Sequence, residues 1–314
     1  MGLGLVVLPP GLAATALRVF PAESNLTAML TSFVSYGIVA YGMALLFLLI
    51  ALVRARRRTL LVVLTALTAA MLGCHLIWLA PLFVADHRPA TTAPFTVLSL
   101  NLLGGNADSE QLMSQAAAVD VAVLLETTPT ALRRLEALGW DRRFPYAAGG
   151  SERFSSGSAI YSRYPLTDQE VIPTSFPQRA ATAAIPGIGQ VRIVAVHPCN
   201  PFCGEGTWLA EHEQLRSVAA AHRGQPLVLA GDFNAVEDHL PLRRLRADGL
   251  VSATDLLGAG WLPTYPANRA VPPVIPIDHV LLSPELTATA LSRFAVSGTD
   301  HLGLITSVAG TTVN

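Results

Sequence analysis

Acidic, amide and imidazole side chains follow apolar runs at several points in this sequence. In "QPLVLAGDFNAV", the apolar run 226–230 ends just before Asp232 and Asn234. Similar arrangements recur along the chain, at Asn101, Glu126, His197, Asp278, Asp300 and His301. A buried carboxylate costs on the order of several kcal/mol unless it is paired or bound to a metal. We therefore expect these groups to converge on one site.

The elements that must position these residues are short β-rich runs that alternate with helical segments. Strands are predicted at 95–103, 121–127, 157–162, 181–185, 191–197, 226–233, 276–283, 288–296 and 302–309. Helices are predicted at 108–118, 129–138 and 207–222, with Thr207 as the cap of the last one. Fully apolar strands need both faces covered, which indicates sheets packed under helices.

Six separated motifs together resemble one known superfamily. They are, in order, "SLN", "LLE", "SAIYSRYP", "VAVHP", "GDFNA" and then "IDHV" with "TDH". This set is similar to the endonuclease/exonuclease/phosphatase superfamily of metal-dependent phosphoesterases, which includes deoxyribonuclease I, inositol-polyphosphate 5-phosphatases and neutral sphingomyelinases. The resemblance covers roughly 95–309. It implies a four-layer α/β sandwich, in which two packed mixed β-sheets are flanked by helices.

The resemblance also implies a metal site. Glu126 would hold a divalent ion, Mg2+ or Mn2+, with Asn101 and Asp300 nearby as direct or water-mediated ligands. Oxygen ligands of this kind suit a hard ion that keeps several of its waters.

The remaining motif residues would carry out the catalytic steps. Asp232 and Asn234 would orient the attacking water and the phosphoryl oxygens, since a spacing of two places both side chains on one face of an extended strand end. His301 would act with Asp278, which fixes the ring's orientation and favours its charged form. His197 would donate to a phosphoryl oxygen or to the leaving group.

Further candidates lie outside these motif positions. Tyr161, Arg179 and Trp261 are candidate substrate contacts, although a surface ion pair is the alternative for Arg179 and a packed surface loop is the alternative for Trp261. Cys199 and Cys203 are expected to form a local disulfide in an exported domain. A metal site is the alternative, but two cysteines without a second pair make a weak one.

Two long uncharged stretches precede this domain. Residues 31–53 and 59–85 each reach the length of a bilayer's hydrocarbon core, about 30 Å, and predict transmembrane helices. Residues 1–20 predict either a short first span or a signal peptide. We therefore expect a transmembrane region over 1–85, a polar linker over 86–94 and a catalytic domain over 95–314.

The loop between the two long stretches, "RARRR", is basic and predicts a cytoplasmic position. Everything after about residue 85 would then lie outside the cytoplasm, in a multi-pass protein of the cell membrane. From position 84 onward there are 16 arginines against 21 acidic residues, a formal charge of −5. Because phosphate-backbone binding relies on a basic face, this balance argues against a dedicated nucleic-acid binder. No protein partner can be inferred.

The combination of membrane helices and an exported phosphoesterase domain resembles the VanJ-type proteins of actinobacteria, which are linked with teicoplanin resistance. This resemblance implies a membrane-anchored substrate, such as a phospholipid or the cell-wall carrier undecaprenyl pyrophosphate. An exported nuclease, a sphingomyelinase-like phosphodiesterase and a catalytically inactive receptor are the alternatives. The receptor would lack some of the motif residues, and none of them is missing.

Overall fold

The computed structural model describes residues 2–21, 24–55, 58–150 and 157–312. Contacts within the chain divide it into two compact units. The first comprises Met1–Pro81 with Glu237–Leu240, and the second comprises Leu82–Val236 with Pro241–Asn314.

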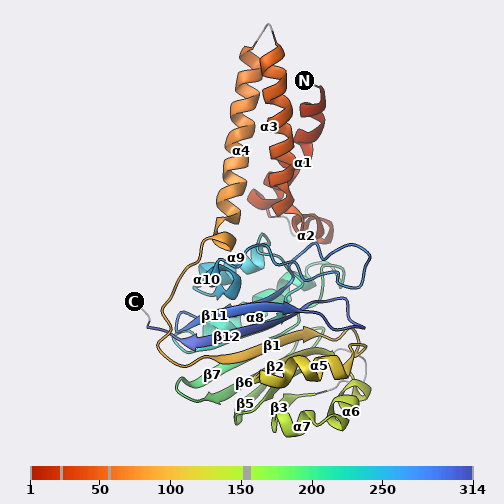
Figure 1. The fold of residues 1–314 in the computed structure, drawn as a ribbon, viewed down its shortest axis with the longest axis vertical. Coiled ribbons are helices and arrows are strands. Elements are labelled where there is room, and N and C mark those ends of the chain that lie inside the picture. The colour runs from red at the N-terminus through yellow and green to blue at the C-terminus, as the bar shows by residue number, and fades with distance from the viewer. Residues whose placement is uncertain (1, 22–23, 56–57, 151–156, 313–314) are drawn as a thin grey trace. The chain divides into compact units, whose positions relative to one another are not determined.

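The first unit is helical and apolar. It contains α1 (Gly2–Val19), α2 (Asn25–Thr31), the 3-10 turn η1 (Val34–Tyr36), α3 (Gly37–Arg54) and α4 (Thr59–Phe83). Helices α1, α3 and α4 run alongside one another (Figure 1). Val34–Arg54 and Thr59–Phe83 are each long and apolar enough to cross a membrane. Such helices are compatible with membrane anchors or a signal sequence. In the basic loop that carries the topology prediction, Arg56 and Arg57 lie outside the described residues.

A polar contact connects the three apolar helices. The Thr15 hydroxyl of α1 lies 2.7 Å from the Tyr41 hydroxyl of α3 and 3.1 Å from His75 Nε2 of α4. Gly37 lets α3 approach closely, because a Cβ there would stand 2.4 Å from the His75 ring. Small residues and interhelical hydrogen bonds are the features that pack apolar helices together.

The second unit contains two six-stranded sheets, each with one parallel strand pair. The first has the order β11-β12-β1-β2-β4-β3 and the second β5-β6-β7-β8-β10-β9. Their bounds are β1 (Phe95–Asn101), β2 (Val121–Thr127), β3 (Tyr146–Gly149), β4 (Gly157–Ser162), β5 (Leu166–Ile172), β6 (Gln178–Ile185), β7 (Gly189–Val196), β8 (Leu227–Asp232), β9 (Val251–Ser252), β10 (Asp278–Leu282), β11 (Leu286–Phe294) and β12 (Gly303–Gly310).

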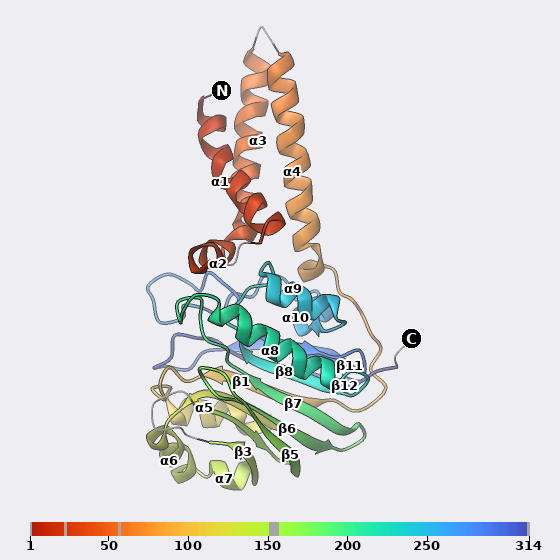
Figure 2. The same cartoon turned by 180° about the vertical axis from the view of Figure 1, so that it is seen from behind.

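The main core lies between the two sheets, and the helices cover their outer faces. Alternate residues of β2, such as Val121 and Val123, face the inter-sheet core, while Ala122 and Leu124 face a second core. The second core is covered by α5 (Ser109–Gln115), η2 (Ala116–Ala118), α6 (Pro129–Ala137) and α7 (Trp140–Arg143). Helix α8 (Thr207–Ala221) lies over the other sheet (Figure 2), and α9 (Leu240–Ala247) and α10 (Ala253–Leu257) complete the unit. The predicted four-layer α/β sandwich is confirmed.

The strand predictions missed β3, β5 and β9 and were correct for the other described strands. β5 carries exposed, mostly polar side chains and has no apolar run to mark it, while β3 and β9 are very short. Helix α8 begins at Thr207, but Gly206 precedes it in a left-handed conformation with no side-chain cap. Thr207 is therefore the first helical residue instead of the expected cap.

The predicted linker 86–94 belongs to the second unit. The Asp86 N–H donates to Asp255 O (3.0 Å), and the Thr91 N–H donates to Gly310 O (2.8 Å). Residue 90 also forms an isolated bridge with Thr311. The backbone groups of this connector are thus paired with the second unit.

Gly231 allows β8 to pass closely beside β7 just before Asp232. Its φ is +150°, and a Cβ at this position would lie 2.0 Å from the Val196 carbonyl oxygen. Both the backbone conformation and the space therefore require glycine here.

We expect Gly231→Ala to lower the free energy of unfolding by about 3 kcal/mol, since the neighbouring strand cannot move without loss of its ladder. Gly187→Ala is the matched control, because Gly187 also has a positive φ (+79°) but has nothing within 4 Å of the added Cβ. It should cost about 1 kcal/mol. Equal losses in denaturant unfolding would contradict the steric argument.

Candidate active site

The motif residues converge at one end of the two sheets. β1 and β2 run in parallel and end at Asn101 and Glu126, while β7 and β8 run in parallel toward His197 and Asp232. β10 is antiparallel to β8, and its first residue pairs directly with Asp232, so Asp278 reaches the same edge from the opposite direction. The loop before β12 contributes Asp300 and His301.

Asn101 connects the acids of the two sheets. Its Nδ2 donates to Glu126 Oε1 (3.0 Å) and lies 3.2 Å from Asp232 Oδ2. Its Oδ1 accepts the Leu103 N–H at 3.0 Å, and its carbonyl accepts the Thr299 hydroxyl at 2.7 Å. Asn101 therefore acts as a hydrogen-bond donor to the acids of both sheets, while its side-chain oxygen accepts from the backbone.

Glu126 is aimed at the site by a β-bulge. Strand alternation alone would send it toward the helix side with Ala122 and Leu124. The register with β4 shifts between Leu125 and Thr127, and Glu126 has a φ of +53°. Bulges and positive φ angles re-aim side chains at functional sites at an energetic cost. The Gly104 N–H then holds Glu126 Oε2 at 2.7 Å.

His301 and Asp278 form a buried hydrogen-bonded pair. His301 Nδ1 donates to Asp278 Oδ2 at 2.9 Å, as the resemblance implied. Burial lowers the pKa of His301, but the carboxylates of Asp278, Asp232 and Asp300 together outweigh burial and raise its pKa to about 10. The imidazole is therefore a cation at neutral pH.

Asp232 lies between the two imidazoles. Its Oδ2 is 3.9 Å from His197 Nε2 and 3.7 Å from His301 Nε2, and its side chain is 2% exposed. Burial is the main cause that raises the Asp232 pKa, and burial likewise lowers the His197 pKa. At these positions His197 is the neutral imidazole and His301 the charged one.

Asn234 reaches the site in a different way from that expected. β8 ends at Asp232, and Asn234 has a φ of +47°, so the extended-strand spacing argument does not hold. Its backbone N–H donates to Asp232 Oδ1 (2.8 Å), and its Nδ2 donates to the Pro198 carbonyl (3.0 Å). Asn234 thus orients Asp232 and fixes the segment that follows His197.

Two buried residues that sequence reasoning missed support His197. Gln178 Oε1 accepts the His197 N–H at 3.0 Å. The Glu211 carboxylate of α8 accepts the Ser175 N–H (2.6 Å) and the Cys199 N–H (2.7 Å). The available signals were the polar Gln178 at the start of an alanine-rich strand and an acid on the buried face of an amphipathic helix.

The donor set fits a divalent cation. Among the described residues no hydrogen-bond donor reaches the buried Oδ1 atoms of Asp300 and Asp278. Asp232, Asp278 and His301 offer ligand atoms within 4.8 Å of one another. However, His301 is already paired with Asp278, and a hard ion prefers oxygen ligands. The carboxylates of Glu126 and Asp300 are partly exposed and offer oxygens of the kind that a hard ion prefers.

The peripheral candidates fall in three different environments. Tyr161 is not at the site: it is buried in the core, with its ring 5.6 Å from that of Trp140, because β4 alternation points it under the helices. Burial also raises its pKa. Arg179 lies against Gly149 of β3, whose missing side chain makes room for it. Trp261 is partly exposed, in the loop after α10.

Cys199 and Cys203 are free thiols in the structure, not the expected disulfide. Cys199 is buried and Cys203 exposed, and a hydrogen bond between their side chains helps to raise the Cys199 pKa after burial, its main cause.

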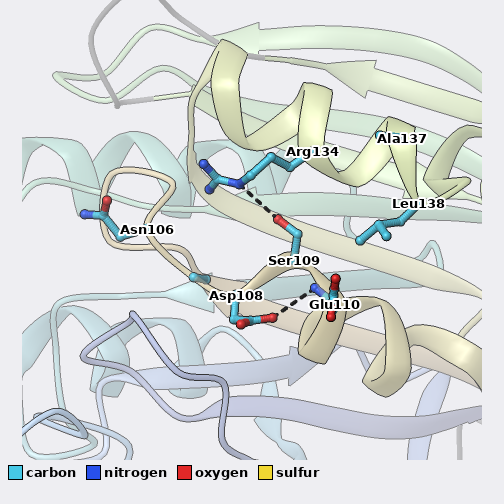
Figure 3. A pocket seen from close by; sticks show the side chains of 8 residues that line it. Asn106, Asp108, Ser109, Glu110, Arg134, Ala137 and Leu138 are labelled. Atoms are coloured by element: carbon cyan, nitrogen blue, oxygen red, sulfur yellow. Dashed lines mark hydrogen bonds between the residues drawn. The ribbon is translucent and has the colours of Figure 1, made fainter.

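A separate groove of about 520 Å³ lies between α5 and α6 (Figure 3). It is lined by Asn106, Ala107, Asp108, Ser109, Glu110, Arg134, Ala137 and Leu138. Arg134 Nε donates to the Ser109 hydroxyl (3.3 Å), and Asp108 Oδ1 accepts the Glu110 N–H (3.0 Å). None of the lining residues belongs to the converged cluster, so this groove is distinct from the candidate site.

Comparison with known proteins shows the family of this chain. The profile of the endonuclease/exonuclease/phosphatase family matches residues 98–301, which contain every residue of the cluster. The chain belongs to the endonuclease/exonuclease/phosphatase family. Members of this family are typically hydrolases of phosphoester bonds and typically depend on a divalent metal. A search of curated proteins finds no significant match.

Several solved structures share the fold. Humanized D. rerio TDP2 aligns over 68% of this chain and 98% of its own, with 16% identity and a TM-score of 0.55. The human Nocturnin catalytic domain with bound sulfate aligns over 71% and 97%, with 18% identity and a TM-score of 0.52. A mannosyl-6-phosphatase from Bacteroides thetaiotaomicron aligns over 68% and 99%, with 15% identity and a TM-score of 0.51. At these identities, the likeness shows the fold alone.

The charge on His301 can be measured directly. In metal-free protein, we expect the His301 ring resonances to titrate near pH 10 by NMR. Asp278→Asn removes the strongest of the carboxylates that raise the pKa, so the titration should move to lower pH. A raised folded-state pKa stabilises the fold fully below about pH 6.5, and this contribution is lost as pH rises through about 10. An unchanged titration in Asp278→Asn would contradict the assigned pairing.

Proposed function

We propose that this chain is a membrane-anchored, metal-dependent phosphoesterase whose catalytic domain lies outside the cytoplasm. Its substrate is a phosphate ester or pyrophosphate of a lipid carrier, such as undecaprenyl pyrophosphate. The catalytic part of this proposal rests on the position of Asp232, whose Oδ2 lies within 4 Å of Nε2 of both His197 and His301. Burial lowers the pKa of His197, whereas neighbouring carboxylates raise the pKa of His301. The family membership is consistent with it.

In the proposed reaction, water attacks phosphorus in line with the leaving oxygen. Asp232, oriented by the Asn234 N–H, accepts a proton from the attacking water. A carboxylate whose pKa is raised by burial is a better base for this step than an exposed one. His301, charged and held by Asp278, stabilises negative charge on the phosphoryl oxygens.

His197 lies on the other side of Asp232, with Nε2 facing both Glu126 Oε1 (3.7 Å) and Asp232 Oδ2. Gln178 accepts the backbone N–H of His197 and so holds its main chain, and Nε2 donates to a phosphoryl oxygen or to the leaving group. Glu126 and Asp300 would hold Mg2+ or Mn2+. The bound ion would supply Lewis-acid stabilisation of the phosphoryl oxygens.

The lipid substrate is supported by composition and by the apolar helices. Two helices have the length and apolarity of membrane spans, and an anchored enzyme meets anchored substrates at high effective concentration. The formal net charge of the domain is negative, which argues against a nuclease because a nuclease would need a basic groove. A role in cell-wall metabolism and glycopeptide resistance would follow from a polyprenyl substrate.

Activity assays on the full-length protein in detergent test the reaction. With Mg2+, the protein should release phosphate from undecaprenyl pyrophosphate, and Asp232→Asn and His301→Gln should lower kcat by about a thousandfold. Chelation by EDTA should abolish activity and Mg2+ should restore it. Asp141→Asn, an exposed acid of α7, is the matched control and should be unaffected.

Sphingomyelin and plasmid DNA provide the competing outcomes of the same assay. Plasmid cleavage that is lost in both variants, without phosphate release from the lipid, would replace the proposed substrate with nucleic acid. Sphingomyelin hydrolysis alone would indicate the phosphodiesterase alternative. No turnover of any substrate in the unaltered protein would favour the inactive receptor.

Reporter fusions test the orientation. A reporter that is active only outside the cytoplasm should be active when fused after the last residue, and one active only in the cytoplasm should be inactive. Replacing Arg54 and Arg58 by glutamine should weaken this orientation, because the basic loop directs it. The opposite reporter pattern in the unaltered protein would contradict an extracytoplasmic domain.

A further inference from the structure

Each imidazole of the candidate site carries an aromatic ring on its face. The Phe176 ring is stacked on His197, with centroids 4.9 Å apart and an interplanar angle of 15°. The Tyr265 ring packs at 5.0 Å from His301 with a tilt of 47°. Both aromatic side chains are only partly buried. They are referred to below as the aromatic pair.

The aromatic pair borders the position where phosphate would lie. Both imidazoles direct Nε2 toward Asp232 Oδ2, so the reacting phosphorus would be between them. A substrate bound there would have the rings that cover the two histidines beside it. Partly exposed rings at this position are therefore available to the substrate and are not simply core residues.

Hydrogen bonds hold the backbone beside both rings. Glu211 binds the Ser175 N–H next to Phe176 and also binds the loop that follows His197. On the other side, the Ala267 N–H donates to Asp300 O (2.7 Å), and the Leu302 N–H donates to Thr264 O (2.9 Å). The rings are thus presented by pre-organised backbone, which lowers the entropic cost of binding.

Exposed apolar side chains continue outward from the same two regions. Phe202, in the loop held by Glu211, is 66% exposed, and Val271, six residues after Tyr265, is 59% exposed. The segments 198–206 and 258–277 lie at the same end of the sheets in both views (Figures 1 and 2). The two chain segments that carry the backbone supports of the aromatic pair therefore also expose apolar side chains.

We propose that Phe176 and Tyr265 form the specificity subsite of this enzyme and bind the aliphatic chain of the substrate. This inference rests on the proposed phosphoesterase function and adds the chemical class of the substrate, a phosphate or pyrophosphate that carries an aliphatic chain. The side chain of Phe176 has no polar atom and that of Tyr265 has only its hydroxyl, so the subsite favours hydrocarbon. An aromatic ring contacting hydrocarbon gains affinity through the apolar area that it removes from water.

Two soluble probes test the subsite with the full-length protein. Farnesyl pyrophosphate and dimethylallyl pyrophosphate share the same phosphate ester and differ in chain length. Phe176→Ala should raise KM for the farnesyl substrate about tenfold and change KM for the short one about twofold or less, since only the longer chain covers the ring. Tyr265→Ala should act likewise, and Tyr265→Phe, which keeps the ring, should retain the preference.

Phe176→Leu separates an apolar contact from aromatic stacking. It should restore most of the farnesyl preference, because leucine supplies hydrocarbon contact without a π face. Tyr146→Ala, an exposed aromatic residue of β3 away from the cluster, is the matched control and should leave both KM values unchanged. Equal losses of kcat on both probes in Phe176→Ala would show that the ring only positions His197, and would overturn the proposal.

Binding measurements keep this test independent of turnover. Calorimetry with Asp232→Asn and a non-hydrolysable farnesyl phosphonate should show affinity that falls about tenfold on adding Phe176→Ala. Affinity that depends on Phe176 without hydrolysis in the unaltered protein would refute the proposed reaction and keep the subsite. Affinity that is the same with and without the ring would refute the subsite, and tighter binding of a nucleotide than of the phosphonate would assign the rings to base stacking.

Discussion

A single buried carboxylate, that of Asp232, determines how this site is built. A carboxylate at the end of a central strand is stable only when its neighbours compensate for its lost hydration. Here the Asn234 N–H and the Asn101 amide donate to it, and two imidazoles face it. These partners come from both sheets. The packing of the two sheets therefore serves both folding and the assembly of the site.

The surroundings of the two histidines shift their pKa values in opposite directions. His301 is surrounded by three carboxylates and is held in its charged form, whereas burial dominates at His197 and favours its neutral form. Two residues of one type are thus prepared for opposite tasks by their surroundings. This difference between neighbouring groups is a general mark of acid–base sites.

Local backbone strain occurs at positions that aim these side chains. Glu126 and Asn234 both have positive φ, and Gly231 passes within van der Waals distance of β7. Such conformations persist only where surrounding hydrogen bonds and packing compensate for them. The Gly104 and Asn234 backbone donors provide part of that compensation. The same hydrogen bonds that compensate for the strained backbone therefore also set the positions of the site's side chains.

The sequence alone was sufficient to predict the apolar strands, the layered α/β architecture and most of the residues that meet in the cluster, because apolar runs and polar strand ends are local patterns. It also predicted the pairing of His301 with Asp278, through the family resemblance. Tertiary structure alone decided the direction of the Asn101 amide, the bulge at Glu126, the core position of Tyr161 and the supporting roles of Gln178 and Glu211. These features depend on partners that are distant in sequence. A local pattern cannot show which partner a polar atom will find.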